Sequence, residues 1–241
     1  MRPSERPLAT VPWAVRVLLL AALAAQIAWQ VAQPRPVARA AELAAPPPFA
    51  ALRISSLGEP NSLAQLLTLY FQAFDNQPGI SVPFRDLDYR RVTQWLATLL
   101  DLDPRGQYPL LMASQVYSQV PDQARERTMY EFVHEQFRRD PNRRWRWLAH
   151  AAIMAKHRLH DDALALGYAD DIARFALTAP NWARQMRIFL LEDLGELESA
   201  RILLGGLLAS GEIKDEHELR FLAGRLEALK NGEKPSSATK N

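Results

Sequence analysis

Apolar residues recur at three- and four-residue steps through most of the chain. Met129, Phe132 and Val133 follow this spacing, and similar runs fill residues 60–229. The period places apolar side chains on one face of an α-helix, whereas the alternation typical of a β-strand is scarce. The pattern predicts an all-α fold with one short strand, which we expect at residues 51–55.

Prolines divide this helical region at regular intervals. Pro104, Pro141 and Pro180 are separated by 37 and 39 residues. Because proline cannot continue a helix, each is expected to mark the end of a hairpin's second helix. Each proline is followed by an aromatic residue on the next predicted helix, namely Tyr108, Trp145 with Trp147, and Trp182.

A small residue follows the predicted turn in the middle of each unit. These residues are Ala124, Ala163 and Ala200, at separations of 39 and 37 residues. Alanine allows two helices to approach closely where a larger side chain would hold them apart. We therefore expect all three alanines to lie at tight helix crossings.

The proline junctions resemble those of a known repeat family. Leu102-Asp103-Pro104-Arg105 and Arg139-Asp140-Pro141-Asn142 resemble the LDPN junction of the tetratricopeptide (TPR) family, and Leu194-Gly195-Glu196-Leu197-Glu198-Ser199-Ala200 resembles its G-x-x-x-x-A turn. The resemblance covers about residues 86–229 and implies a TPR-like α-solenoid of stacked helical hairpins. The period of 37–39 residues departs from the family's 34 or so, and no unit carries the complete family pattern. An irregular helical bundle is the alternative.

The segment at residues 13–32 is apolar enough to cross a membrane. It carries no charge after Arg16, and a helix of this length spans about 30 Å, the thickness of a hydrocarbon core. Arg16 can extend to the headgroups, and Trp13 and Trp29 lie near the two ends, where interfacial aromatic residues belong. The pattern predicts a single-pass transmembrane anchor.

Two other interpretations of this segment remain open. In a cleaved signal peptide, Arg2, Arg6 and Arg16 would form the charged region, and Ala38-Arg39-Ala40 would be the cleavage site. About a dozen residues, prolines among them, separate the apolar run from that site, which favours a retained anchor. A buried core helix is the third interpretation.

Five segments follow from these patterns. The N-terminal side carries Arg2, Arg6, Arg16 and the free amine, against Arg35 and Arg39 on the other flank, so the positive-inside rule places residues 1–12 in the cytoplasm and the body in the periplasm or another extracytoplasmic space. After the anchor, residues 33–59 form a proline- and alanine-rich stalk, which we expect to be extended. The helical domain covers residues 60–229, and the polar residues 230–241 are predicted to be a disordered tail.

Composition and motifs exclude several kinds of chemistry. The chain has no cysteine, so it can hold no disulfide, thiolate nucleophile or Cys-ligated metal. Its net charge of +2 does not by itself indicate nucleic-acid binding. No P-loop, G-x-S-x-G or G-x-G-x-x-G motif is present. We expect no enzyme activity, cofactor, small-molecule substrate or nucleic-acid partner.

The densest charge lies around Pro141, where residues 138–158 hold seven Lys and Arg against one carboxylate. These arginines either pair with acidic residues such as Glu126, Glu131 and Glu135, or bind an acidic protein face, an acidic polymer or anionic lipid. RNA becomes a candidate only if the body is cytoplasmic. The candidate binding residues are Arg138, Arg139, Arg143, Arg144 and Arg146.

The expected role is a protein-interaction or assembly scaffold at the cell envelope, because solenoids present extended concave surfaces. The first helix of each hairpin usually lines that surface. Further contact candidates are therefore Tyr117, Trp147, Arg184 and Arg187.

A histidine cluster gives the alternative function, an envelope ligand-binding module or enzyme. His150, His157 and His160 lie at i, i+7 and i+10, and Asp161 and Asp162 follow directly. The cluster lacks the H-E-x-x-H spacing of a helical zinc site, so we expect no metal. Histidines near a helix C-terminus are the simpler interpretation.

Overall fold

The computed structural model describes residues 11–33, 41–77, 79–211 and 213–231. The chain divides into two units, residues 1–40 with 78–80, and residues 41–77 with 81–241. Most of the predicted N-terminal segment and of the predicted tail lies outside the described residues.

The first unit contains α1 (Trp13–Ala32), which has the bounds predicted for the anchor. The helix is long and apolar enough to cross a membrane, and none of its residues is buried. It begins directly after Pro12, whose fixed φ suits a position at a helix start.

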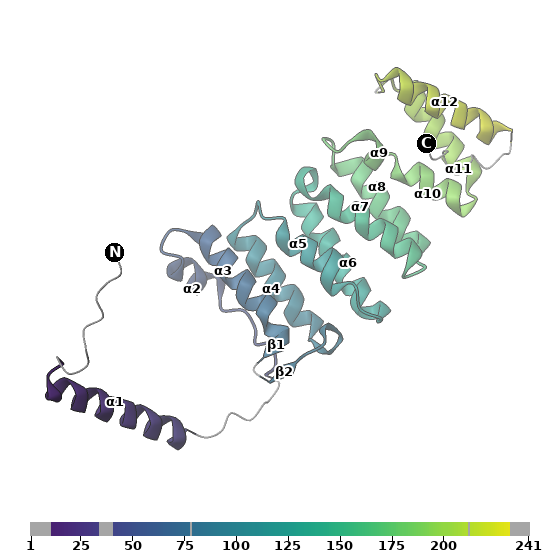
Figure 1. Cartoon of the computed structure of the whole chain (residues 1–241). Coiled ribbons are helices and arrows are strands. Elements are labelled where there is room, and N and C mark those ends of the chain that lie inside the picture. The colour runs from purple at the N-terminus through teal and green to yellow at the C-terminus, as the bar shows by residue number, and fades with distance from the viewer. Residues whose placement is uncertain (1–10, 34–40, 78, 212, 232–241) are drawn as a thin grey trace, which may run out of the picture. The chain divides into compact units, whose positions relative to one another are not determined.

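The second unit is helical almost throughout, which confirms the all-α prediction (Figure 1). Its short elements at the N-terminal side include two strands of two residues each, and the boundary between the units falls within the second strand, between Ile80 and Ser81. In chain order the elements are α2 (Phe49–Ser55), α3 (Pro60–Gln72), η2 (Ala73–Asp75), β1 (Asn76–Gln77), β2 (Ile80–Ser81), η3 (Phe84–Asp86), α4 (Tyr89–Leu102), α5 (Tyr108–Met112), the π-helical turn η4 (Ala113–Tyr117), α6 (Gln123–Arg139), α7 (Pro141–His157), α8 (Asp162–Phe175), α9 (Asn181–Arg184), α10 (Met186–Leu194), α11 (Leu197–Ala209) and α12 (Glu216–Lys230).

Helices of the second unit pack in the order in which they occur. Four hairpins, α3–α4, η4–α6, α7–α8 and α10–α11, each pair two helices that contact one another, and α12 packs on α11. Helices of neighbouring hairpins also touch, as α6 does with α7 and α8 with α10. Figure 1 shows these pairs lying side by side.

The predicted helix breaks are confirmed. Pro104 lies between α4 and α5, Pro141 is the first residue of α7, and Pro180 directly precedes α9. Aspartates start several helices: the side chains of Asp88, Asp122, Asp161 and Asp215 accept hydrogen bonds from backbone N–H groups of the first turn.

The prediction for the three alanines is wrong for two of them. Ala200 is fully buried, but Ala124 and Ala163 are exposed. The buried position is the fourth residue after the N-cap, which is Ala200 in α11, Ala165 in α8 and Glu126 in α6. Ala124 and Ala163 lie two residues before this position, because a small residue after a turn does not by itself show where the helix begins.

The prediction of a strand at residues 51–55 is also wrong, because these residues belong to helix α2. Leu52 is buried against Ala64 and Leu102, while Ile54 faces outward. One buried residue in a helix of seven residues gives no periodicity from which to recognise a helix.

The end of the predicted stalk packs on the helical unit. Residues 41–48 have no regular structure, as their prolines predict, but Leu43 is buried in the main core. The Trp95 indole Nε1–H donates to the Ala44 carbonyl at 2.8 Å, and the Gln77 amide both accepts from and donates to the Ala41 backbone, at 2.7 and 3.1 Å. Residues 41–59 therefore belong to the helical unit and not to an extended stalk, and the stalk predicted for residues 34–40 lies outside the described residues.

Two large apolar clusters stabilise the second unit. The main core runs from Leu43 to Leu190 and includes most buried residues of α4 through α8. A separate cluster joins α10, α11 and α12, and consists of Ile188, Leu191, Ala200, Leu204, Ile213, Leu222 and Leu229.

Candidate protein-interaction surface

Large exposed apolar side chains in the later part of the second unit occur on α5, α7, α9 and α12. Tyr108 on α5, Ile153 on α7, Trp182 on α9 and Phe221 on α12 are all large and exposed. The other exposed large apolar residues described from α5 onward are Phe175, Leu177 and Ile202. An apolar surface that follows one set of helices is typical of an interaction site.

Two adjoining hollows lie along this set of helices, and both are lined by Trp182 and Phe189. We call the combined hollow the aromatic groove. Its lining residues are Ile153, Lys156 and His157 from α7; Asn181, Trp182, Gln185, Met186, Phe189, Leu190 and Asp193 from α9, α10 and the residue between them; and Glu218 and Phe221 from α12.

The aromatic residues of the groove are held by their neighbours. Trp182 meets Trp145 of α7 edge-to-face, with ring centroids 5.4 Å apart. The Arg225 guanidinium lies 4.9 Å from the ring centroid of Phe189 and 5.6 Å from that of Phe221. Because these side chains are fixed before any partner arrives, binding would cost them little conformational entropy.

Five of the six polar residues of the groove, all except His157, are paired with one another across helices. Lys156 Nζ lies 2.6 Å from an Asp193 carboxylate oxygen, which joins α7 to α10. The side-chain amides of Asn181 and Gln185 donate to Glu218 at 2.9 and 2.6 Å, which joins α9 and its following residue to α12. An apolar floor bordered by satisfied polar groups matches the composition of a protein–protein contact.

The predicted arginine patch is mostly committed to contacts within the chain. Arg138 pairs with Asp171 at 3.1 Å, Arg139 with Asp101 at 3.0 Å and Arg143 with Asp140 at 2.8 Å. Arg146 is exposed and has no polar partner among the described residues. These arginines therefore pair with aspartates, of which Asp101 and Asp171 belong to neighbouring hairpins, and not with the glutamates that the sequence suggested.

Arg144 is buried where α7 meets α6 and the loop after α4. Its guanidinium donates to the Gln136 carbonyl at 2.8 Å, to the Gln136 side chain at 3.1 Å and to the Pro104 carbonyl at 3.1 Å. Burial lowers the pKa of this guanidinium from its ordinary value. Arg144 thus cannot belong to a surface binding patch, and its role is to join α6, α7 and the loop after α4.

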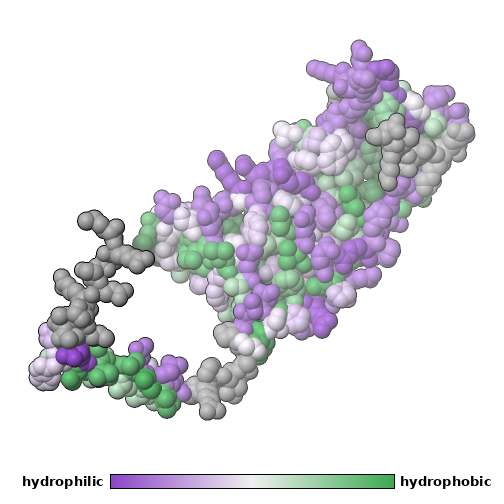
Figure 2. Space-filling model, in the orientation of Figure 1, coloured by the Kyte–Doolittle hydropathy of each residue, from purple (hydrophilic) through white to green (hydrophobic). Residues whose placement is uncertain are grey.

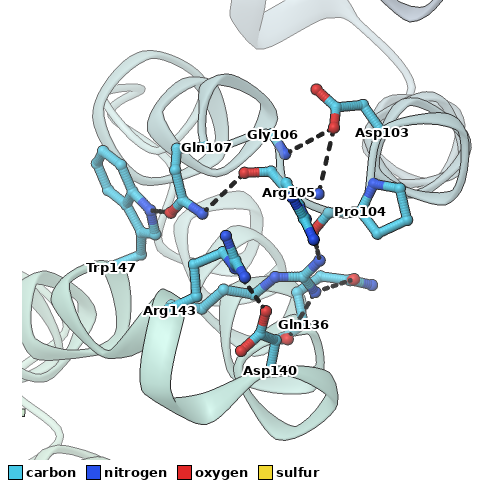
Figure 3. A network of polar contacts seen from close by, with 10 residues as sticks. Asp103, Pro104, Arg105, Gly106, Gln107, Gln136, Asp140, Arg143 and Trp147 are labelled. Atoms are coloured by element: carbon cyan, nitrogen blue, oxygen red, sulfur yellow. Dashed lines mark hydrogen bonds and ion pairs between the residues drawn. The ribbon is translucent and has the colours of Figure 1, made fainter. Parts of the chain in front are cut away.

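Tyr117 and Trp147 are core residues, which corrects their prediction as contact residues. Trp147 is buried and its indole N–H donates to the Gln107 side chain at 2.7 Å, as Figure 3 shows. Tyr117 packs against Phe71 and Phe84, and its backbone carbonyl accepts from the Tyr89 hydroxyl at 2.6 Å. Both side chains point into the junctions between helices, where an aromatic ring fills more space than an aliphatic chain.

The other two predicted contact residues lie near the groove but line a different hollow. Arg184 and Arg187 border a pocket together with Asp170 of α8 and Leu203 of α11. Arg187 forms an ion pair with Asp170, which also pairs with Arg174 at 2.9 Å.

The predicted histidine cluster is not assembled. His157 and His160 are exposed, and His150 lies half-buried on α7. Asp161 is engaged elsewhere, since it caps α8 and pairs with Arg127 at 2.7 Å. Among the described residues, no three His, Asp or Glu side chains come close enough to hold a metal ion.

Most of the groove could not be recognised in the sequence. Two of its residues stand out there, Trp182 as the aromatic residue after Pro180 and His157 in the histidine cluster, whereas Phe189, Phe221 and Glu218 do not. Their apolar spacing is that of any amphipathic helix, so only the packing of α12 beside α9 and α10 shows that they share a surface.

No protein-family model, curated protein or solved structure matches this chain.

Proposed function

We propose that this chain is a single-pass membrane protein whose TPR-like α-solenoid binds a protein partner through the aromatic groove. It would serve as an interaction or assembly scaffold at the cell envelope, with the body on the extracytoplasmic side. A reporter fused after Asn241 tests that orientation, which follows from the excess of positive charge at the N-terminal side, where Arg2, Arg6 and Arg16 lie.

Contacts between hairpins support the solenoid. Hydrogen bonds between side chains far apart in sequence recur at nearly one period: Trp147 to Gln107 spans 40 residues, Arg139 to Asp101 spans 38, and Lys156 to Asp193 spans 37. Such regular separations are expected when each unit contacts only its neighbours.

The aromatic groove is the observation on which the binding role depends. Its floor is apolar, its aromatic residues contact neighbouring side chains, and its charged residues Lys156, Asp193 and Glu218 already have polar partners within the chain, so a partner need not satisfy these charges. Partner segments that fit are those presenting apolar side chains at regular spacing, such as one face of an amphipathic helix.

In-cell photo-crosslinking tests this role. A crosslinking amino acid at position 153, in the full chain in its membrane, should yield discrete protein adducts. Trp182→Ala or Phe221→Ala should lower adduct yield about tenfold, the effect of removing an interface hot spot. Phe175→Ala is the matched control, because Phe175 is 49% exposed against 55% for Trp182 but lies outside the groove. Adducts that are absent, or that survive the groove substitutions, would contradict the proposal.

A further inference from the structure

A second apolar surface covers α2 and α3 and is separate from the aromatic groove. Figure 2 shows hydrophobic surface over these two helices. Leu66, Leu69 and Tyr70 form an exposed stripe on α3, since residues at i, i+3 and i+4 share one helix face. We call this surface the apolar face. It consists of Phe49, Ile54, Leu57, Leu66, Leu69 and Tyr70.

Several side chains of the apolar face are almost as exposed as in an unfolded chain. Leu57 is 92% exposed, and Ile54 is 78% exposed. The segment that carries them is nearly uncharged: between residues 43 and 74 the sequence has Arg53 and Glu59 as its charged residues. Terminal hairpins of stacked repeats ordinarily have a polar outer face, so this end of the helical unit departs from that rule.

The apolar face lies beside the point where the chain enters the helical unit. Tyr70 packs on Trp95 with ring centroids 5.6 Å apart, and the Trp95 indole donates to the Ala44 carbonyl. The chain from Gln33, just after α1, to Ala41 has eight peptide links, which span at most about 30 Å. If α1 crosses the membrane, this short connection keeps the entry point near the bilayer surface.

We propose that the apolar face docks on the lipid bilayer, at the boundary between headgroups and acyl chains. The proposal rests on the membrane anchor proposed above. Leucine, isoleucine and aromatic side chains with few charges between them suit that boundary. A second copy of the chain could also cover the apolar face. The short connection from Gln33 to Ala41 favours the bilayer, because it keeps the apolar face close to the membrane whether or not a second copy is nearby.

The absence of cysteine from the sequence makes a direct test possible. The full chain is reconstituted in vesicles of phosphatidylcholine and phosphatidylglycerol that contain doxyl-labelled lipid. A single cysteine, introduced as Leu66→Cys, carries an environment-sensitive fluorophore. The matched control is Ile202→Cys on α11, because Leu66 and Ile202 are both 64% exposed. The probe at 66 should be quenched at least about twofold more strongly than the probe at 202.

A further variant and a reference probe in α1 distinguish failure of bilayer docking from failure of the membrane anchor. Leu69→Glu should reduce quenching of the probe at 66 toward the level seen at 202, because it introduces a charge into the lipid contact without disturbing a buried residue. A probe introduced as Leu23→Cys in α1 reports the anchor itself.

Each result supports or overturns the proposal. Strong quenching at 23 with equal quenching at 66 and 202 overturns bilayer docking and leaves the anchor intact. Weak quenching at 23 overturns the anchor and the docking with it. A blue-shifted probe at 66 that lipid does not quench, and whose shift grows with protein density in the membrane, identifies a second copy as the occupant and also overturns the proposal.

Discussion

His150 lies half-buried on α7, and its Nε2 atom is shielded from solvent without a hydrogen-bond partner among the described residues. Burial lowers the pKa of the imidazole, and a hydrogen bond with the backbone of Ser114 offsets only part of that shift. Ser114 belongs to the π-helical turn η4, so the histidine lies where two hairpins meet.

This burial predicts an acid-sensitive fold. Because the folded-state pKa lies below the ordinary value of 6.5, the unfolded chain binds the proton more readily. The free energy of unfolding should fall as the pH drops below 6.5, by at most about 1.4 kcal/mol per pH unit. Above pH 6.5 the imidazole is neutral in both states, so His150 should not make the free energy of unfolding depend on pH. Chemical denaturation of the full chain in detergent at several pH values measures the slope.

His150→Gln should flatten that slope, and the exposed His157→Gln on the same helix should keep the slope of the unmodified chain. If the two variants behave alike, another group causes the acid sensitivity.

A buried carboxylate shows why the sequence misplaced the close helix crossings. Glu126 occupies the position that is alanine in α8 and α11, and it forms an ion pair with Arg158. Burial raises the pKa of Glu126, and the nearby Arg158 opposes the shift. Because its partner lies 32 residues away, no local pattern marks Glu126 as a core residue. The N-cap aspartates Asp122 and Asp161 were visible in the sequence and would have given the correct register.

At the scale of elements, the positions of helix ends could be predicted from the sequence more accurately than which side chains of a helix are buried. Prolines and aspartates act on the backbone of their own neighbourhood, so the breaks at Pro104, Pro141 and Pro180 could be located without tertiary information. Side chains such as Trp147 and Arg144 could not be assigned to core or surface, because their environment is set by a hairpin about one period away.

The junction around Arg144 provides a test at this scale. Arg144→Ala removes three hydrogen bonds and leaves the Pro104 and Gln136 carbonyls without this donor, so it should lower the free energy of unfolding by about 3 kcal/mol. Arg146→Ala, two residues along the same helix, should change it by less than about 0.5 kcal/mol. Denaturant titration of both variants makes the comparison. Equal effects would mean that the Arg144 contacts do not stabilise the junction.

At the scale of the whole molecule, the division of the core into two large clusters predicts two unfolding steps. The C-terminal cluster joins α10, α11 and α12, whereas the main core ends at Leu190. Repeat arrays unfold in parts when contacts between neighbouring units are weak relative to those within them. The C-terminal helices should therefore open before α4 through α8.

Leu204→Ala tests this division. It removes a fully buried side chain from the C-terminal cluster and should cost about 3 kcal/mol locally. Hydrogen exchange should then show faster opening of α10 to α12 with unchanged protection in α6 and α7. Leu148→Ala, which affects an equally buried leucine of the main core, should reduce protection in α6 and α7. Uniform loss of protection after Leu204→Ala would mean that the helical unit opens as one body.

The attachment of residues 41–44 also has a mechanical consequence. Force applied to the chain from its N-terminal side acts first on Ala41, whose backbone is hydrogen-bonded to the Gln77 amide. It acts next on the buried Leu43 and on the Ala44 carbonyl, which accepts a hydrogen bond from Trp95. These attachments lie on β1, just after α3, and on α4. Tension would be absorbed by the first hairpin, and the helices that form the aromatic groove would carry no load.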